Sequence, residues 1–438
     1  MRFQQPLAVF DDLPTMNLPT MKLITTTLLL LLLLCIPAIV FADAPSTDVV
    51  DRSTLTGKVM CGYQGWFNCE GDGAKLGWTH WARNLRELPA RGNVTVDLWP
   101  DMTEYDADER YATGFRHADG STAEVFSSTN RKTVLRHFDW MQQYGIDGVF
   151  LQRFASGLKS RSQREHKDRV LDHVREGAQR SGRAYAVMYD LSGLRADDTN
   201  LIQQDWLEMQ SSQHVTDDEA YLHHEGKPVV SIWGIGFNDN RQYTLDYCHR
   251  LVSWFKSQGC TVMIGVPSYW RTLERDAVDD AQLLEIIQLA DIVSPWSVGR
   301  YRSPSEATRH AENVWAKDKA WCQQHDQDFL PVVFPGFSWH NLKGDPLASI
   351  PRRKGEFLWS QIVAAKRMSC EMIYVAMFDE VDEGTAIFKC TDQPPVGDGV
   401  QFLGYEGLPS DYYLRLVGEA GKLLRNEIPI SVPLPQPY

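Results

Sequence analysis

The sequence predicts a (β/α)8 barrel formed by residues 57–425 as a single domain. Apolar strand-like runs alternate with stretches of helical period, which indicates a parallel sheet covered by helices. The 438-residue chain has nine such runs and no G-x-G-x-x-G turn. This combination favours a barrel of the α/β class over a doubly wound dinucleotide-binding fold.

The expected strands follow one another at regular intervals along the chain. In order they are KVMCGYQGWF, VTVDLWPD, DGVFLQRF, AYAVMYDLS, PVVSIWGIG, TVMIGVPSYW, DIVSPWSVG, LPVVFPGFSW and MIYVAMFDE. A barrel uses only eight, so we expect one extra strand or hairpin, either the first run or PVVSIWGIG.

The helical patterns between these runs place apolar residues on one face. NRKTVLRHFDWMQQYG aligns Val134, Phe138 and Met141, and GEFLWSQIVAAKRM precedes the last strand. A helix at about 409–425 is expected to close the barrel. Residues 43–56 are a short linker, and the proline-rich residues 426–438 form a tail without a core of its own.

The amino end has the pattern of a targeting segment. Residues 1–42 are expected to be a signal peptide, with Lys22 before an uncharged apolar run and a small residue at Ala42. Translation from Met21 fits the same pattern. The run 23–42 is also about long enough to span a bilayer, so an uncleaved anchor is the alternative. We therefore expect a secreted or periplasmic protein, attached to a membrane only if this segment is uncleaved.

Charge and cysteine content narrow the function classes. A formal net charge of −13 argues against binding to nucleic acid or to an anionic membrane surface. Export would place the chain where disulfides persist, yet seven cysteines remain beyond Cys35, so at least one stays unpaired. No C-x-x-C or histidine-rich spacing indicates zinc, and we expect neither a metal nor another cofactor.

Polar and aromatic residues gather at the carboxyl ends of the predicted strands. These residues are Gln64, Trp66, Trp99, Asp101, Gln152, Arg153, Tyr189, Asp190, Tyr269, Trp270, Trp296, Trp339, His340 and Glu380. In a barrel these ends meet at one rim, where active sites lie. Any one of them could be a strand end meeting water, but a solvated rim has no need of so many tryptophans. Indole faces beside carboxylates and amides suit an oligo- or polysaccharide.

The last strand ends in four carboxylates, on Asp379, Glu380, Asp382 and Glu383. Close like charges repel and raise one another's pKa, so the cluster is costly unless solvent, a cation or a chemical task compensates. Glycoside cleavage needs a proton donor and a second carboxylate, and Glu380 and Glu383 are suitable. Both enter one cleft only if the chain turns between them, which Gly384 permits.

Several pieces of the chain resemble glycoside hydrolase family 99 and the broader family 71/99-like group, the endo-α-mannanases and endo-α-mannosidases. FDEVDEGT is similar to FNEWHEGT at that family's last strand, GWTHW to its W-x-H-W, and LWPD to its FYPE. YGIDGVFLQRF is similar to AGIGVLVLSWW. GKPVVSIWG and PGFSWHN also have counterparts, so the resemblance covers about residues 57–390.

The resemblance implies a retaining, endo-acting α-glycosidase. By position, Glu380 would assist the sugar's own 2-hydroxyl in forming an anhydrosugar, and Glu383 would be general acid and then base. Trp78, His80 and Trp81 would line the sugar subsites. The role of Glu383 requires a raised pKa, which Asp382 and Glu380 would promote.

The chain departs from the family pattern beside the catalytic pair. Asp379, Val381 and Asp382 replace the family's Asn, Trp and His, which points to a different sugar in the cleaved subsite. Arg153 replaces a family Trp and either pairs with a carboxylate or sulfate of the substrate or forms an internal salt bridge with Asp190.

Two other classes of function stay open at the level of the sequence. A noncatalytic carbohydrate-binding barrel would keep the tryptophans without requiring both glutamates. A metal-dependent hydrolase or lyase would use the acidic strand end as a cation site, although DEVDEG lacks the alternating ligand spacing of a calcium loop. A merely solvated acidic loop is the third interpretation of the same residues.

Overall fold

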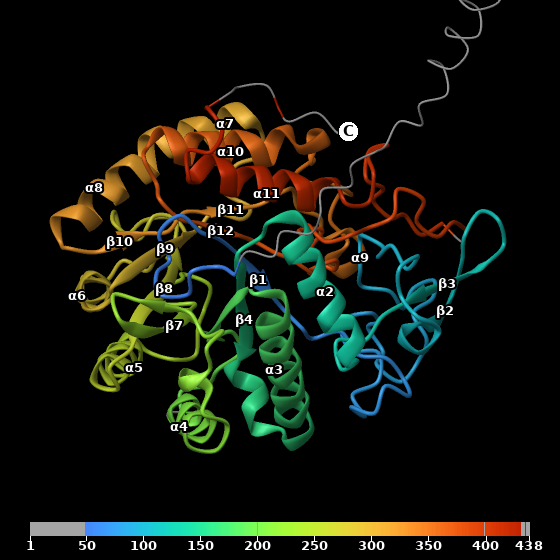
Figure 1. Ribbon diagram of the computed structural model, residues 1–438, viewed down its shortest axis with the longest axis horizontal. Helices are drawn as coiled ribbons and strands as arrows, with labels where there is room; N and C mark the ends of the chain where they lie inside the picture. Colours follow the sequence, from blue (N-terminus) through green and yellow to red (C-terminus); the bar gives the residue numbers. More distant parts are fainter. Residues whose placement is uncertain (1–48, 199, 398, 431–433, 435–438) are drawn as a thin grey trace, which may run out of the picture. The chain divides into compact units, whose positions relative to one another are not determined.

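The computed structural model describes residues 49–198, 200–397, 399–430 and 434 (Figure 1). The expected signal segment, residues 1–42, lies outside the described residues, as do parts of the linker and tail. Among the helices of the described part, none combines the length and apolarity needed to cross a membrane.

Eight parallel strand positions form the barrel. Along the chain they are β1 (Val59–Tyr63), β4 (Gly148–Phe154), β5 (Ala184–Asp190), β7 (Lys227–Trp233), β8 (Thr261–Pro267), β9 (Ile292–Trp296), β10 (Asp328–Phe329) with β11 (Val332–Val333), and β12 (Ile373–Val375). The strands are neighbours in the order β10-β9-β8-β7-β5-β4-β1-β12-β11. β5 and β8 are buried along their whole length, as expected for strands covered on both faces.

The barrel closes through one interrupted strand. β10 pairs with β9, and β11 pairs with β12, while only Leu330 and Pro331 separate the two pieces. The backbone N–H of Leu330 donates to the carbonyl of Val293, and the Pro331 carbonyl accepts from Tyr374. LPVVF is therefore the seventh strand position of a closed (β/α)8 barrel.

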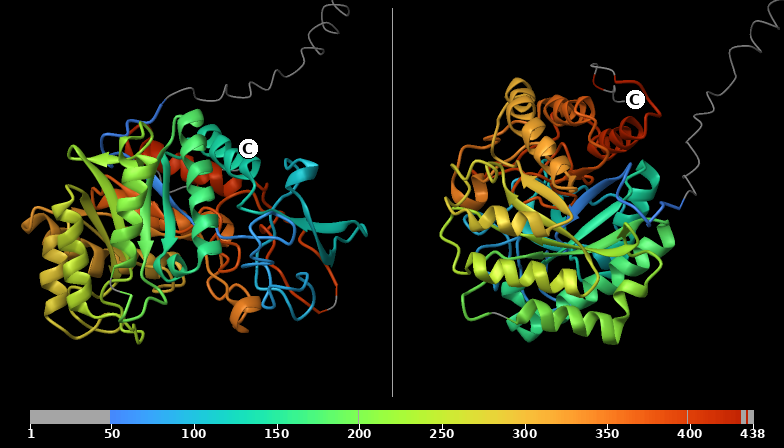
Figure 2. Two further views of the ribbon diagram at one scale, coloured as in Figure 1. Left: turned by 90° about the horizontal axis from the view of Figure 1, so that it is seen from below. Right: turned by 90° about the vertical axis from the view of Figure 1, so that its left-hand side faces the viewer.

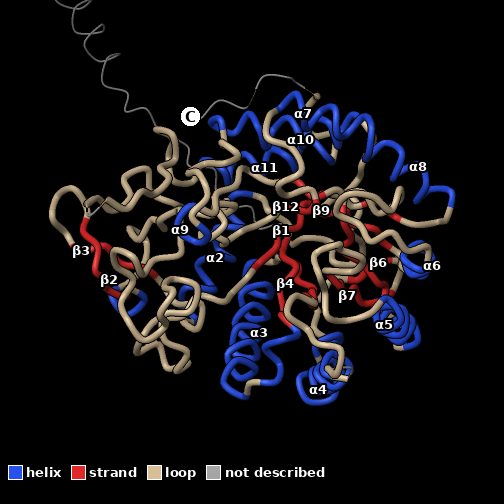
Figure 3. The backbone as a smooth tube through the Cα atoms, turned by 180° about the vertical axis from the view of Figure 1, so that it is seen from behind, coloured by secondary structure: helices blue, strands red, loops and turns tan. Residues whose placement is uncertain are grey.

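Helices surround the sheet on its outer side (Figures 2 and 3). They are α2 (Arg131–Tyr144), α3 (Arg161–Ser181), α4 (Leu201–Gln213), α5 (Leu245–Ser257), α6 (Gln282–Leu289), α7 (Pro304–His310), α8 (Ala316–Gln324), α10 (Glu356–Arg367) and α11 (Tyr412–Leu424). The short α9 (His340–Lys343) belongs instead to the loop after β11, at the carboxyl ends of the strands. The predicted apolar face of α2 is buried at Val134, Phe138 and Met141. The expected last helix is α11.

Neither of the two runs that the sequence suggested as the extra strand is extra. KVMCGYQGWF and PVVSIWGIG contain β1 and β7, which both belong to the barrel, so that prediction was wrong. VTVDLWPD is extended but joins no strand and forms only isolated bridges, Leu98 with Leu403 and Pro100 with Cys390. Its apolar residues are buried because it packs against the loop after β12, where Asp97 and Leu98 donate backbone hydrogen bonds to Val381.

Additional strands lie outside the ring. β2 (Tyr111–Arg116) and β3 (Thr122–Val125) form an antiparallel hairpin between β1 and β4 in sequence, which Figure 1 shows beside the barrel. The short β6 (His223–His224) pairs antiparallel with β7. The expectation of an added hairpin is met by these elements rather than by any of the nine predicted runs.

The seven described cysteines are all buried free thiols. Burial raises the pKa of each thiol, well above its ordinary value for Cys61 and Cys69 and to about 12 for the other five. These thiols are therefore protonated and unreactive in the folded chain. The domain is held together by its core without covalent cross-links.

Candidate active site

A pocket of about 980 Å³ opens where the carboxyl ends of the barrel strands meet. Its aromatic lining consists of Trp66, Phe154, Trp233, Phe237, Trp296, Phe337 and Trp339. Its carboxylates are Asp190, Asp239, Asp345, Glu380 and Glu383. A cavity of this size with apolar walls and few convergent polar groups is typical of a small-molecule or glycan site.

The loop after β12 brings both glutamates to this pocket. The chain turns at residues 381–384, and Gly384 has φ +65°, a conformation that suits glycine. A Cβ at this position would lie 3.1 Å from the backbone nitrogen of Ser338, tighter than ordinary contact. The turn required for Glu380 and Glu383 to share one cleft is therefore present.

Glu380 is held by two hydrogen-bond donors. The amide of Gln64 donates to one carboxylate oxygen at 2.6 Å, and the hydroxyl of Thr385 donates to the other at 2.8 Å. The side chain is 4% exposed, and burial, followed by the charges of Glu383 and Asp382, raises its pKa well above the ordinary value. The two donors act in the opposite direction, because they favour the charged form.

Glu383 is partly exposed to the pocket. Burial and the nearby charge of Asp382 raise its pKa to about 8, while the neighbouring Trp339 indole and Lys343 act in the opposite direction. The sequence predicted the direction of this shift from like-charge repulsion, and burial is the larger cause. A carboxyl with this pKa keeps its proton at neutral pH and can donate it.

The two aspartates between and before the glutamates have separate roles. Asp379 is fully buried and accepts backbone N–H groups of Gln64 and Gly65 at 2.7 and 2.9 Å, which fixes the turn after β1. Asp382 accepts from the His80 ring at 2.8 Å, and that ring stacks on Trp66 with centroids 3.7 Å apart. Asp382 therefore links the loop to an aromatic wall of the pocket.

Eight of the residues predicted for the rim or the site line this pocket. They are Gln64, Trp66, Gln152, Asp190, Trp296, Trp339, Glu380 and Glu383. Gln152 is oriented by Tyr374, whose hydroxyl accepts from its amide at 3.0 Å. Asp190 lies at the end of β5, and burial raises its pKa to about 6.

The other ten predicted residues do not line the pocket: Trp78, His80, Trp81, Trp99, Asp101, Arg153, Tyr189, Tyr269, Trp270 and His340. Trp81 and Trp99 are buried core residues whose indoles donate to the carbonyls of Phe126 and Glu124. Asp101 accepts from Thr103 and caps a turn. These side chains satisfy local packing, which the same residue types at strand ends can equally do.

Arg153 departs most clearly from the predicted substrate contact. Its guanidinium is 2% exposed and pairs with Asp205 and Asp168, with N–O distances of 2.6 Å to each. The hydroxyl of Tyr189 donates to the same Asp205 at 2.8 Å. The internal salt bridge is thus formed with these two aspartates instead of Asp190, because β4 directs this side chain outward toward α3 and α4.

Asp97 was not predicted for the site, yet it fixes one wall of it. It is fully buried, and its carboxylate accepts the backbone N–H groups of His340 and Asn341 at 2.7 and 2.8 Å. It thereby anchors α9, which carries Lys343 beside Trp339. Its position inside an apolar run was the only signal in the sequence, because a charged residue there must be paired.

Further lining residues come from the end of β7 and the loop that follows it. Trp233 contacts Trp296 edge to face with centroids 5.2 Å apart, and the Arg241 guanidinium lies 5.2 Å from the Trp233 ring. Phe237 packs on Trp233 at 4.8 Å. Trp233 follows the apolar part of the run PVVSIWGIG, so the rule that marked the other strand ends applied here as well.

The acidic strand end is not arranged as a metal site. Asp379, Glu380 and Asp382 each have protein donors on their carboxylates. In the part of the chain that the structure describes, the carboxylates close enough together to share an ion belong to Asp106, Asp108 and Glu109. Those carboxylates lie elsewhere and pair with Lys132 and Arg136.

No protein-family model and no curated protein matches the chain. A solved family 99 endo-α-mannosidase from Bacteroides thetaiotaomicron matches with a TM-score of 0.61 and 14% identity, over 85% of this chain and 99% of that one. The chain has the fold of a family 99 glycoside hydrolase. A structure of that mannosidase with bis-tris-propane matches at 0.60 and 15% over the same shares. A glycoside hydrolase-like protein matches at 0.53 and 13%, over 86% and 97%.

The resemblance seen in the sequence is thereby confirmed for the fold. At such low identity the likeness extends to the backbone and not to chemistry, so activity must be argued from the site itself. Within the family 99 fold of this chain, the E-x-x-E pair follows the last barrel strand and lines its main pocket.

Proposed function

We propose that this protein is a secreted glycoside hydrolase that cleaves α-linked glycans with retention, using Glu380 and Glu383. The observation that carries the proposal is a pair of carboxyl groups with raised pKa values in an aromatic-lined pocket of glycan size. Secretion rests on the apolar segment at 23–42.

The proton of the pair is expected to reside on Glu383. Two interacting carboxyl groups lose their protons in separate steps, because the first charge disfavours the second. Donors on both oxygens of Glu380 stabilise a charge there, whereas Glu383 has the pocket-facing position. At neutral pH this gives one base and one acid.

This arrangement performs two balanced steps. Glu380 takes the proton of the 2-hydroxyl while that oxygen attacks the anomeric carbon, and Glu383 gives its proton to the departing glycosidic oxygen. Water then opens the anhydrosugar: Glu383 takes a proton from the water, and Glu380 returns its proton to the 2-oxygen. Two inversions at one carbon give retention.

Reducing-end release tests the proposal directly. The chain without residues 1–42 is expected to release reducing ends from an α-linked member of a panel of α- and β-linked oligo- and polysaccharides. Proton NMR of the first product should show the α anomer before mutarotation. The β anomer as first product would contradict retention. Binding without release would favour a noncatalytic carbohydrate-binding barrel, and loss of activity with a chelator would favour the metal-dependent class.

Asp382→Asn is expected to shift the alkaline limb of the pH–rate profile downward by roughly one pH unit. The Asp382 charge raises the pKa of both Glu380 and Glu383. Without it Glu383 loses its proton at lower pH, so the acid form disappears earlier as pH rises. Asp345→Asn, an exposed pocket carboxylate, is the control. If the alkaline limb does not shift in Asp382→Asn, that limb does not report the loss of the Glu383 proton.

A further inference from the structure

We propose that the pocket takes a glycan that carries anionic groups, either uronate carboxylates or sulfate esters, and that Lys343 and Arg302 bind them. This inference rests on the proposed glycosidase function and adds a substrate class to it. Its basis is a group of cations at the pocket mouth, called the basic rim: Arg241, Arg300, Arg302 and Lys343.

The basic rim contrasts with the rest of the molecule. The chain has a formal net charge of −13, yet the loops after β7, β9 and β11 each bring at least one cation to the same pocket. Neutral glycans are bound by stacking and hydrogen bonds and need no such cations. Cations at this opening that no carboxylate of the protein pairs with would attract an anionic ligand.

Two of the four cations are already paired. Arg241 forms a bidentate salt bridge with Asp239, with N–O distances of 2.6 and 2.8 Å, and Arg300 forms a salt bridge with Asp276 at 2.6 Å. Among the described residues, no carboxylate oxygen lies within 4.0 Å of the charged groups of Arg302 and Lys343. These two side chains therefore have their charge and donors free for a ligand.

Hydrogen bonds fix the backbone that carries each of the two unpaired cations. The backbone N–H of Arg302 donates to Glu306 at 2.7 Å at the start of α7. Lys343 ends α9, whose first residues are held by the buried Asp97. The Lys343 ammonium lies 5.9 Å from the ring of Trp339. A sugar stacked on this indole would present a ring substituent to the ammonium.

The carboxylates of the pocket do not cancel the basic rim. Lys343 acts to lower the pKa of Glu383, but burial and Asp382 outweigh it, so Glu383 stays protonated at neutral pH and does not neutralise the lysine. Asp190 and the charged Glu380 are buried deeper in the pocket, at 7% and 4% exposure, away from the exposed side chains of Arg302 and Lys343. At the mouth Asp345 is the exposed carboxylate that opposes the two free cations.

Binding of a substrate anion, which the sequence suggested for Arg153, fits Lys343 and Arg302 better. The sequence offered Arg153 as a partner for a substrate carboxylate or sulfate, but its guanidinium is sealed against Asp205 and Asp168. Lys343 and Arg302 offer the same chemistry from the pocket side. Neither was predicted as a site residue, because Arg302 lies in the loop before α7 and Lys343 at the end of α9, both well beyond the strand ends.

Matched pairs of glycans test the inference. Calorimetry at low salt would compare α-1,3-linked mannan oxidised to the uronate at C6, and the same mannan sulfated at C6, each with the unmodified polymer. In α-mannosides the 2-hydroxyl lies trans to the glycosidic oxygen, as its attack on the anomeric carbon requires. The wild type is expected to bind one charged member at least about tenfold more tightly than its neutral counterpart, and added NaCl should weaken this preference. The pair that shows the preference distinguishes carboxylate from sulfate.

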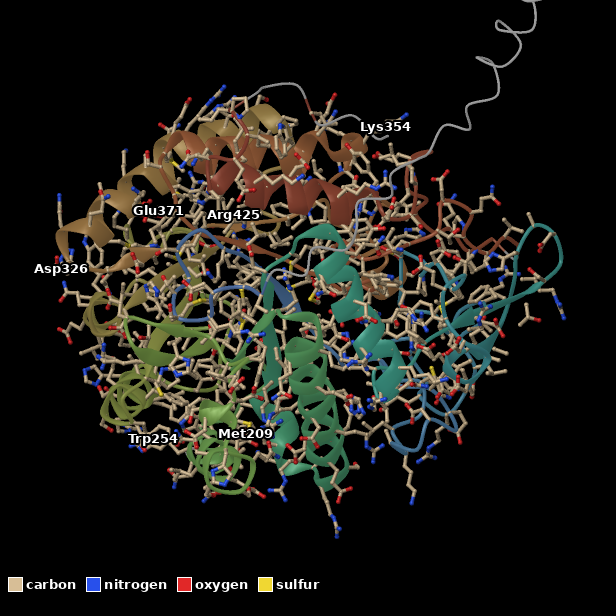
Figure 4. All side chains as sticks on the ribbon, viewed as in Figure 1. Met209, Trp254, Asp326, Lys354, Glu371 and Arg425 are labelled. Atoms are coloured by element: carbon tan, nitrogen blue, oxygen red, sulfur yellow. The ribbon has the colours of Figure 1, made fainter. Side chains whose placement is uncertain are left out.

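Lys343→Gln/Arg302→Gln is expected to lose this preference by about tenfold or more, with unchanged thermal unfolding. Lys354→Gln, at an exposed lysine labelled in Figure 4, is the matched control and should bind as the wild type does. Equal affinity for charged and neutral members, no binding of any charged glycan, or an unaffected double variant would overturn the inference.

Release of reducing ends from the same glycans keeps the two proposals distinguishable. If the wild type cleaves a neutral glycan and the double substitution does not change the rate, the proposed glycosidase function stands and the proposed anionic substrate is overturned. Salt-sensitive binding of a charged glycan without release by the wild type would support the anionic site and count against the hydrolase.

Discussion

Glu383→Gln should lower kcat/KM by about 10³-fold, and Glu380→Gln by a similar factor. Glutamine keeps the volume of each side chain but supplies neither the acid for the leaving oxygen nor the base for the 2-hydroxyl. The measurement is the initial rate of reducing-end release at pH 7 on whichever glycan the wild type cleaves. Glu371→Gln, at an exposed glutamate labelled in Figure 4, is the control.

Thermal unfolding separates this chemical loss from misfolding. A carboxyl whose pKa is raised in the folded state destabilises the fold once the pH exceeds its unfolded value, and the full effect is present above the folded value. For Glu383 this window runs from the ordinary glutamate range to about 8. Glu383→Gln should therefore unfold at the same or a higher temperature than the wild type at pH 8. Full activity in Glu383→Gln would refute the assigned roles.

Arg153→Met should destabilise the domain by about 3–5 kcal/mol, because it leaves the buried Asp205 carboxylate without its cation. Arg153 contacts both oxygens of Asp205 at 2.6 Å, and both side chains are almost fully buried. Urea unfolding followed by tryptophan fluorescence measures the loss. KM below the unfolding temperature should stay unchanged, since Arg153 lies outside the pocket.

The matched variants isolate the buried charge as the cause. Arg153→Met/Asp205→Asn should recover part of the lost stability, because asparagine is neutral and still accepts from Tyr189. Arg161→Met breaks an exposed pair with Glu165 and should leave the unfolding transition in place. A raised KM in Arg153→Met with wild-type stability would return this residue to the substrate site.

The barrel was predictable because its strands are apolar on both faces and alternate with amphipathic helices. The prediction erred at VTVDLWPD, where Val94, Val96 and Leu98 are buried by packing against other loops rather than by a sheet. An apolar run reports burial, and it does not report which backbone groups will pair with it. The interruption at Pro331 was equally hidden, because closure depends on strands distant in the chain.

The site residues were predictable where their position at a strand end determines that the side chain points to the pocket. Gln152 and Asp190 lie near the carboxyl ends of β4 and β5, the E-x-x-E pair follows β12, and all four side chains reach the pocket. Tryptophans were misleading, because an indole at the same kind of position packs in the core at Trp99 and faces the pocket at Trp296. Loop residues such as Arg302 could not be placed, since their positions depend on how each loop returns to the barrel.

The reactivity of the seven buried thiols can be used to measure unfolding of the domain. Each is shielded and protonated in the fold, so a thiol-specific dye can react only after the surrounding packing opens. The rate of dye incorporation then follows the opening of the barrel, region by region, as the cysteines are spread from β1 at Cys61 to the loop at Cys390. The described part of the fold requires no oxidant, because none of its cysteines forms a disulfide.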